Sequence, residues 1–496
     1  MRETKPEVPA ATKTKAAAAA PAANNMKAAA AAPNRCASDG AVAGRSARDG
    51  GSGGGLISDL PDDILGTIVS LLPTKDGARS QAIARRWRPI WRSAPLNLQA
   101  DYNLCLDESK QPSIVSKILS DHNGTARRFI YDFILVQNAK SIEAWFHSLS
   151  LANLQELDIN FQHLDYSYDR EKRYPLPPSV LLCASTLVVA KISFCCFPKK
   201  TSPSPRFPLL KQLNLWHVSI SEDVFHGVLS CCHVLESLDL LAIGDVGCFH
   251  ISSPTLRSVR LCSCLSRKGE LVIEDSPRLD RLLLSCPREG RETIRVSGAP
   301  KLEILGPLSP HTSKIEIANQ VFKSLIPTNL SCTINTVKVL ALGCSVPNLN
   351  VVIDVLRCFP YLEKLYVIWA KYFETRVQNG REYDLLDPVK CLETHLKKLV
   401  LTNYEGGEQD VGFSKFFVSN AKVLKEIKFR VSKKINKEWV ADPYRLLEVG
   451  NRASRDAKLK FIRSTSKFLD AHDLSSADPF SYYIFNEVDA LSGESY

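Results

Sequence analysis

Cysteines are the residues of this 496-residue chain that could bind a metal or form disulfides, and there are fifteen of them. Close pairs occur at Cys195–Cys196, Cys231–Cys232 and Cys262–Cys264, but no pair is spaced C-x-x-C and no histidine follows at a zinc-finger distance. A zinc site needs four ligands that converge tetrahedrally, which this spacing does not offer. Because the N-terminal residues do not resemble a secretory signal, we expect buried thiols, no metal and no disulfide framework.

Motifs for catalysis or phosphate binding would indicate an enzyme or a nucleotide-binding protein. The chain contains no nucleophile elbow, dinucleotide fingerprint or zinc-protease motif. The glycine run at Gly50–Gly55 is not a phosphate loop, because no Lys-Ser/Thr follows it to contact phosphate and magnesium. We therefore predict no catalytic residues and no cofactor.

A stretch of arginines and tryptophans raises the possibility of nucleic-acid binding; its members are Arg85, Arg86, Trp87, Arg88, Trp91 and Arg92. Aromatic rings between basic side chains can stack on bases while the cations track the backbone. Trp87 and Trp91 lie one helical turn apart, however, so both fit the core of a small helical unit. This interpretation leaves the arginines on a solvated face and disfavours nucleic acid as a partner.

Composition indicates a soluble globular protein with two or three domains: 45% of residues are hydrophobic, 23% are charged, and the net charge is +10. No segment approaches the ~18 uninterrupted apolar residues of a membrane span, so we expect no membrane association. Residues 1–55 are rich in Ala, Pro, Lys and Gly and predict a flexible tail and linker.

Three short helices are predicted from Leu56 onward. Pro61 suits the first position of a helix whose apolar stripe reaches Leu72, and Pro73 ends it. A second helix is expected from about Lys75 to Ile83 and a third over Arg85–Trp91. Some forty residues bury too little core to be stable alone, so the apolar stripe is the place to bind a partner.

A leucine pattern repeats from about residue 150. Segments of the form L-x-x-L-x-L, or close to it, begin at Leu154, Leu210, Leu235, Leu256, Leu279, Leu302 and Leu362. From Leu235 to Leu302 the steps between successive lead leucines are 21, 23 and 23 residues. This is the period of leucine-rich repeats, in which each strand buries alternate residues and stacks on the next. Cys264, Cys286 and Cys344 are expected just after repeat strands; an asparagine ladder is missing, which predicts an irregular solenoid.

The stretch from Leu60-Pro61-Asp62-Asp63-Ile64-Leu65 through Leu71-Leu72-Pro73 to Trp87 and Trp91 resembles an F-box. In that family the helices dock on a Skp-type linker subunit, which binds a cullin. The resemblance implies Skp contacts at Leu60, Pro61, Ile64, Leu65, Ile68, Leu71, Leu72 and Trp87. It departs from the family over residues 78–84, where relatives often have a Thr/Ser-rich stretch ending in Val-Leu-Ser and this chain keeps one aliphatic residue, Ile83.

A second resemblance covers residues 391–425, which look like the FBD domain that follows leucine-rich repeats in plant-type F-box proteins. The expected fold is an α+β or α/β solenoid: a three-helix F-box, an irregular repeat region and an FBD-like cap. The expected bounds are 1–55 for the tail, 56–95 for the F-box, 96–385 for the repeats, 386–465 for the FBD-like domain and 466–496 for a C-terminal tail.

This order of domains implies a non-catalytic substrate adaptor of a Skp–cullin–F-box ubiquitin ligase in the nucleus or cytoplasm. We expect an unidentified protein target to bind the repeats or the longer insertions near Tyr166–Pro178 and Lys199–Pro208. The alternative is a protein-binding scaffold outside any ligase, with a divergent F-box. A pull-down of Skp and cullin discriminates between the two.

Overall fold

A computed structural model of the protein describes residues 57, 59–101, 103–107, 109–132, 139–161, 174–199, 206–265, 269–285, 292–344, 348–369, 388–431, 435–463 and 479–480. The chain divides into two units, Met1–Ser58 and Asp59–Tyr496. All described residues except Ile57 belong to the second unit. The tail predicted for residues 1–55 lies outside the described residues, as does the predicted C-terminal tail apart from Pro479 and Phe480.

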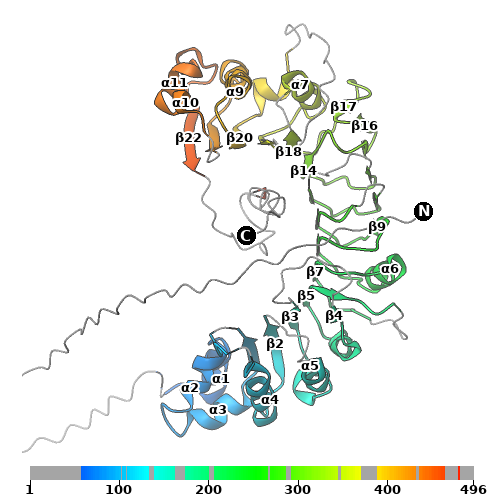
Figure 1. Ribbon diagram of the computed structural model, residues 1–496, viewed down its shortest axis with the longest axis vertical. Coiled ribbons are helices and arrows are strands. Elements are labelled where there is room, and N and C mark those ends of the chain that lie inside the picture. The colour runs from blue at the N-terminus through cyan, green and yellow to red at the C-terminus, as the bar shows by residue number, and fades with distance from the viewer. Residues whose placement is uncertain are drawn as a thin grey trace, which may run out of the picture. The chain divides into compact units, whose positions relative to one another are not determined.

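A parallel sheet of fourteen strands forms the framework of the second unit (Figure 1). In spatial order its strands are β1 (Leu96–Ala100), β2 (Ala126–Tyr131), β3 (Glu156–Asn160), β5 (Val189–Ser193), β7 (Gln212–Trp216), β8 (Ser237–Leu241), β10 (Ser258–Cys262), β12 (Arg281–Leu284), β14 (Ile304–Leu308), β18 (Val339–Cys344), β19 (Lys364–Trp369), β20 (Lys398–Tyr404), β21 (Glu426–Val431) and β22 (Lys458–Arg463). The strands at the regular spacing pair in register, so that Leu238 faces Val259 and Leu282 faces Leu305. This confirms the stacked arrangement that the leucine period predicted.

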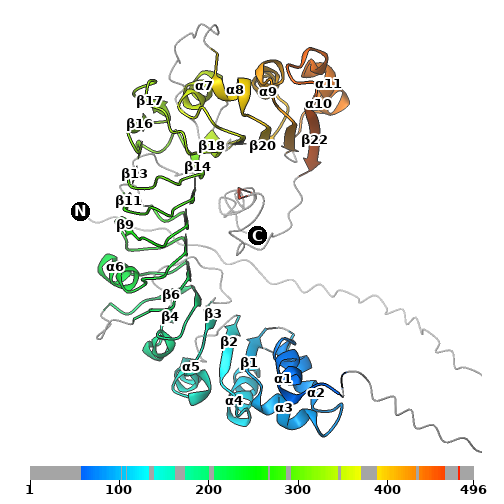
Figure 2. The same cartoon turned by 180° about the vertical axis from the view of Figure 1, so that it is seen from behind.

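Alternation along each strand separates the two faces of this sheet. In β8, Leu238 and Leu240 are fully buried in the main core, whereas Ser237, Asp239 and Leu241 point to the opposite face. We call this opposite face, which carries the same alternate positions of every strand, the inner face. The return segments between strands pack on the other side (Figure 2).

Helices form the return segments at both ends of the sheet: α4 (Gln111–Asp121), α5 (Ala139–Phe146), α6 (Glu222–Ser230), α7 (Leu349–Arg357), α8 (Lys390–Thr394) and α9 (Glu408–Asn420), with 3-10 turns at Leu149–Leu151 and Pro178–Cys183. In the middle a second sheet replaces them, in the order β17 (Ile326–Pro327), β16 (Gln320–Lys323), β15 (Lys314–Ile317), β13 (Thr293–Val296), β11 (Glu270–Glu274) and β9 (Cys248–Ser252). Here the repeats of 21–23 residues each hold two short strands and their turns. A further pair is β4 (Tyr174–Pro175) with β6 (Cys195–Cys196).

Left-handed residues turn the chain out of the sheet after several strands. Phe194, His217, Ala242 and Ser263 each follow a strand directly and have φ between 51° and 58°. None is glycine, so the conformation is held by its surroundings: the His217 N–H donates to the Leu241 carbonyl at 2.7 Å, and the Ala242 N–H donates to the Cys262 carbonyl at 2.8 Å. The neighbouring strand thus fixes each corner.

The FBD-like segment continues the same sheet and supplies its last strands. Its strands β20 and β21 keep the repeat alternation, with Leu399, Leu401, Ile427 and Phe429 fully buried in the same core. Helices α10 (Lys437–Ala441) and α11 (Pro443–Leu446) and a 3-10 turn at Val449–Asn451 lead to the edge strand β22. Exposed Lys458 and Lys460 on β22 discourage the addition of another strand.

Three short helices precede the sheet: α1 (Asp62–Ser70), α2 (Thr74–Ser80) and α3 (Trp87–Ser93). They lie within two or three residues of the predicted bounds, and Pro61 and Pro73 stand just before α1 and α2. None of the helices in the described part of the chain combines the length and apolarity that a bilayer span requires.

Candidate functional site

Helix α1 is held to α3 by its buried side. Leu65 and Val69 are at most 1% exposed. Gly66 faces the same partner, because a Cβ at this position would touch the Ala94 methyl group at 3.8 Å and Ile90 at 3.9 Å, both ordinary contact distances. One face of α1 therefore packs against the other helices, and this packing fixes the direction in which the opposite face points.

The corner that starts α1 is held by an arginine. Arg86 donates to the Leu60 carbonyl oxygen at 2.6 Å and forms an ion pair with Asp62 at 2.6 Å. Sequence reasoning placed Arg86 on a solvated face and missed this role. No local pattern could have revealed it, because the partners lie 24 and 26 residues away.

Helix α2 is joined to the first strand of the sheet. The Thr74 hydroxyl donates to the Asn97 carbonyl at 3.0 Å and accepts from the Gln99 N–H at 2.8 Å. Gly77 lies under the Trp91 ring, where a Cβ would come within 2.6 Å of the indole. Val69 and Trp91 belong to the main core. The three helices thus share the core of the sheet, which compensates for their small size.

The residues predicted to bind Skp divide into two groups. Leu65 is buried, and Leu60 and Trp87 are half-buried, so these three position the helices. Pro61 is exposed, and four aliphatic side chains are 38–73% exposed: Ile64, Ile68, Leu71 and Leu72. Ile83, which follows α2, is 72% exposed. We call Ile64, Ile68, Leu71, Leu72 and Ile83 the docking face; their contact with Skp stays a prediction.

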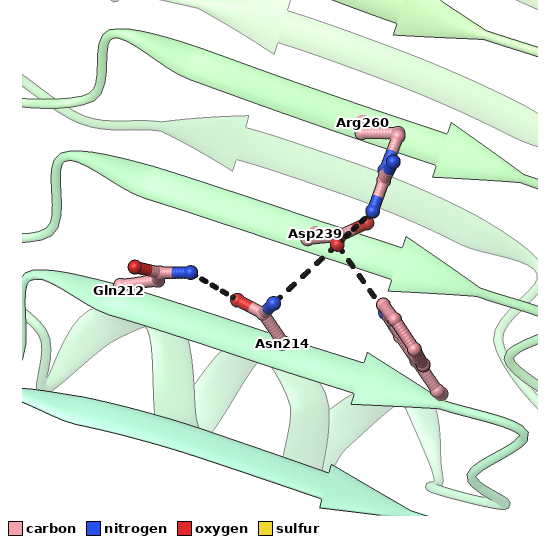
Figure 3. Close-up of polar contacts among 5 residues, drawn as sticks. Gln212, Asn214, Asp239 and Arg260 are labelled. Carbon is pink, nitrogen blue, oxygen red and sulfur yellow. Dashed lines mark hydrogen bonds and ion pairs between the residues drawn. The ribbon is translucent and has the colours of Figure 1, made fainter. Parts of the chain in front are cut away.

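The inner face carries a buried polar network across β7, β8 and β10 (Figure 3). Arg260 donates to both carboxylate oxygens of Asp239, through Nε at 2.6 Å and through a second guanidinium nitrogen. Trp216 Nε1 donates to the same carboxylate at 3.3 Å, and Asn214 Nδ2 donates at 3.5 Å. Gln212 in turn donates to Asn214 at 3.1 Å. Asp239 thus has its acceptors used within the protein, so this network is structural.

Of the twelve cysteines whose side chains the structure describes, seven are buried and five are partly exposed. Burial raises the pKa of Cys183, Cys232 and Cys391 to about 12, which keeps these thiols protonated at neutral pH. No group of His, Cys, Asp or Glu that could hold a metal occurs among the described residues. Cys264 follows β10 as expected, Cys344 is the last residue of β18 rather than beyond it, and Cys286 lies outside the described residues.

Two other predicted surfaces contribute little to the site. Trp91 is 8% exposed and Trp87 is half-buried, so neither offers a free ring for a nucleic-acid base to stack on. The insertions predicted to contact a target lie largely outside the described residues, at 162–173 and 200–205.

A parallel sheet with a 21–23-residue period and return segments on one side is typical of leucine-rich repeats. Residues 142–367 match the family model described as "FBD-associated F-box protein At5g56370, LRR repeats", and residues 384–429 match the model described as "FBD". The chain therefore carries leucine-rich repeats and an FBD domain, as the resemblance indicated.

Similar proteins come from Arabidopsis thaliana. FBD-associated F-box protein At5g56370 is 32% identical over 246 residues, which cover 46% of this chain and 53% of that protein. Putative FBD-associated F-box protein At5g22720 is 23% identical over 456 residues, covering 80% of this chain and 93% of that protein. F-box/LRR-repeat protein At3g59190 is 29% identical over 245 residues, covering 45% and 60%. The chain thus spans about half the length of the first relative. The matched family models describe no enzyme.

Proposed function

We propose that this chain is a substrate-recognition adaptor of a Skp–cullin–F-box ubiquitin ligase. The F-box at Leu56–Ser93 docks on a Skp-type linker subunit and through it on a cullin, and the repeat sheet binds the target. Ubiquitin transfer takes place on partner subunits, while this chain raises the effective concentration of the target's lysines near them. The names of the similar plant proteins support the F-box assignment, and we place the complex in the nucleus or cytoplasm.

The docking face carries this proposal. Ile64 and Ile68 are exposed on α1, whose opposite side is fixed by buried packing, and the other three aliphatic side chains are exposed in the segments that follow α1 and α2. Burying one aliphatic side chain of this size is worth about 1.5–3 kcal/mol, so leaving several exposed together is unfavourable without a partner. A rigid, preformed apolar helix face is the kind of surface that binds another helical subunit.

Pull-down of Skp and cullin by the full chain tests the proposal. Wild type should capture both proteins, and Ile68→Lys should lose both, because a charge would replace a side chain at the centre of the interface. A loss of about 2 kcal/mol at such a position corresponds to a roughly 30-fold weaker Kd for Skp. Ile68 is 40% exposed, so the substitution leaves the packing of the free chain intact.

The matched control is Leu149→Lys, which places the same charge at an aliphatic residue that is 87% exposed and lies in the 3-10 turn Leu149–Leu151, away from α1, α2 and α3 in sequence. This variant should capture Skp and cullin as wild type does. If wild type captures neither protein, the ligase assignment is wrong and the alternative, a protein-binding scaffold, takes its place. If Ile68→Lys binds like wild type, the docking face is not the Skp contact.

A further inference from the structure

A second apolar cluster lies on the inner face, separate from the main core. It is formed by residues from five strands: Cys262, Leu283, Ala341, Tyr366, Ile368 and Val400. All six are at most 5% exposed. In the solenoid these positions alternate with the core-facing leucines, so the main core does not bury them. We call this cluster the inner-face patch.

An aromatic side chain from the C-terminal segment occupies the patch. Phe480 belongs to the same cluster and is 1% exposed. Its ring centroid lies 5.0 Å from that of Tyr366, with the planes inclined at 57°. This distance and inclination suit an attractive contact between aromatic rings. The patch therefore accommodates an aromatic side chain, and the chain supplies one from outside the repeats.

Charge around the patch has one predominant sign. The inner-face positions of β19–β22 carry five lysines, one arginine and one glutamate: Lys364, Lys398, Glu426, Lys428, Arg430, Lys458 and Lys460. The segment that contains Phe480 has the opposite composition, because residues 468–496 include six Asp or Glu and no Lys or Arg. An aromatic residue in an acidic peptide is thus complementary to this half of the inner face.

We propose that the inner-face patch is the target-docking site of the chain, that it binds an aromatic side chain within an acidic peptide segment of the target, and that Phe480 occupies it until a target competes. This inference deepens the proposed adaptor function and rests on it, because the bound protein is a ubiquitination target only if the chain is an adaptor. Binding of the peptide itself does not require Skp. A competitor can bind only when Phe480 has left the patch. Its apparent affinity is therefore its intrinsic affinity multiplied by the fraction of molecules whose patch is uncovered.

A peptide in trans tests this proposal. The probe is a fluorescent peptide copying residues 472–488, measured by anisotropy against the full-length wild-type chain and against Phe480→Ala. The variant should bind with a Kd about tenfold lower than wild type, because its patch is vacant. A peptide in which Ala replaces Phe480 should bind neither chain. Adding Tyr366→Ala to the variant should abolish binding, whereas adding Tyr366→Phe should preserve it.

Each outcome bears on a different part of the proposal. No binding of the probe to Phe480→Ala would overturn the docking site, and equal binding to both chains would overturn occupation by Phe480. Neither result would affect Skp capture, so failure here is distinguishable from failure of the adaptor function. Binding that does not weaken as salt rises would overturn the acidic nature of the partner.

Cysteine labelling gives an independent measurement on the same variants. Cys262 belongs to the patch, whereas Cys264, two residues on, belongs to the main core. Phe480→Ala should speed alkylation of Cys262 and leave Cys264 unchanged, since burial raises the pKa of the Cys264 thiol in both chains. Equal acceleration at the two sites would indicate general loosening and would contradict the proposal, as would unchanged labelling at both.

Discussion

The two halves of the inner face differ in how their buried side chains are accommodated. From β3 to β10 it carries polar side chains that pair with one another: Lys191 lies 3.6 Å from Asp158, and Arg260 binds Asp239 through two nitrogens. From β12 to β20 the inner face also carries apolar residues, among them Leu283 and Ala341, which form one cluster with Phe480. A face that satisfies its own groups needs no ligand, whereas an apolar face must be covered.

Charge also differs along this face. Just after β2, the pKa of Asp132 is raised by burial and then by the neighbouring carboxylates of Asp158 and Asp101. Toward the other end the lysines of β20–β22 predominate. The inner face thus runs from acidic to basic, and an acidic segment is attracted to the half that carries the apolar patch.

Breaking the polar half should have the largest effect. Arg260→Leu leaves Asp239 fully buried without its cation, which should lower the free energy of unfolding by about 3–5 kcal/mol. Chemical denaturation of the full chain measures this difference. A double variant with leucine at both positions should recover most of the loss. If the pair were accessible to water, Arg260→Leu would lower the free energy of unfolding only slightly, and the double variant would not restore it.

Two neighbouring leucines of β12 compare the core with the patch directly. Leu282 is fully buried in the main core, and Leu283 is 2% exposed in the patch. Leu282→Ala should cost about 2–5 kcal/mol of unfolding free energy, but Leu283→Ala only about 1–2 kcal/mol, because a side chain covering the patch can settle into the space. In the Phe480→Ala background the cost of Leu283→Ala should shrink further. Equal costs for the two leucines would show that the patch is as rigid as the core.

The smallest expected effect is that of acid on the stability contributed by Glu426, at the basic end of the inner face. Hydrogen bonds from Lys460 and then Lys398 lower the pKa of Glu426 below its ordinary value of 4.5. A lowered pKa in the folded chain contributes stability above pH ~4.5, and this contribution is lost as the pH falls through the folded-state pKa.

The difference in Tm between wild type and Glu426→Gln measures this contribution. It should be constant near pH 6 and diminish below pH ~4.5, and it should remain small because the partners are solvent-exposed. A difference that grows on acidification would contradict the assigned direction. None of the six residues of the inner-face patch is a carboxylic acid, so Phe480→Ala should show no such change between pH 6 and pH ~4.5.

Much of the architecture was predictable because it depends on local patterns. The prolines at 61 and 73 and the apolar stripe between them placed α1, and the lead leucines placed β8, β10, β12 and β14 side by side. Both signals arise from the period with which side chains return to one face. The exposure of Ile64 and Ile68 was less predictable, because the same stripe also supplied the buried Leu65 and Val69.

The sequence by itself thus determined the three helices that precede the sheet, the strands that begin at the lead leucines, and the order in which those strands stack. Only the tertiary structure decided that Arg86 holds the Leu60 corner, that Asp239 pairs with Arg260, and that Phe480 lies on Tyr366. The reason is physical: alternation and period act between near neighbours in the chain. These contacts join side chains that come together only after the strands have stacked and the inner face exists.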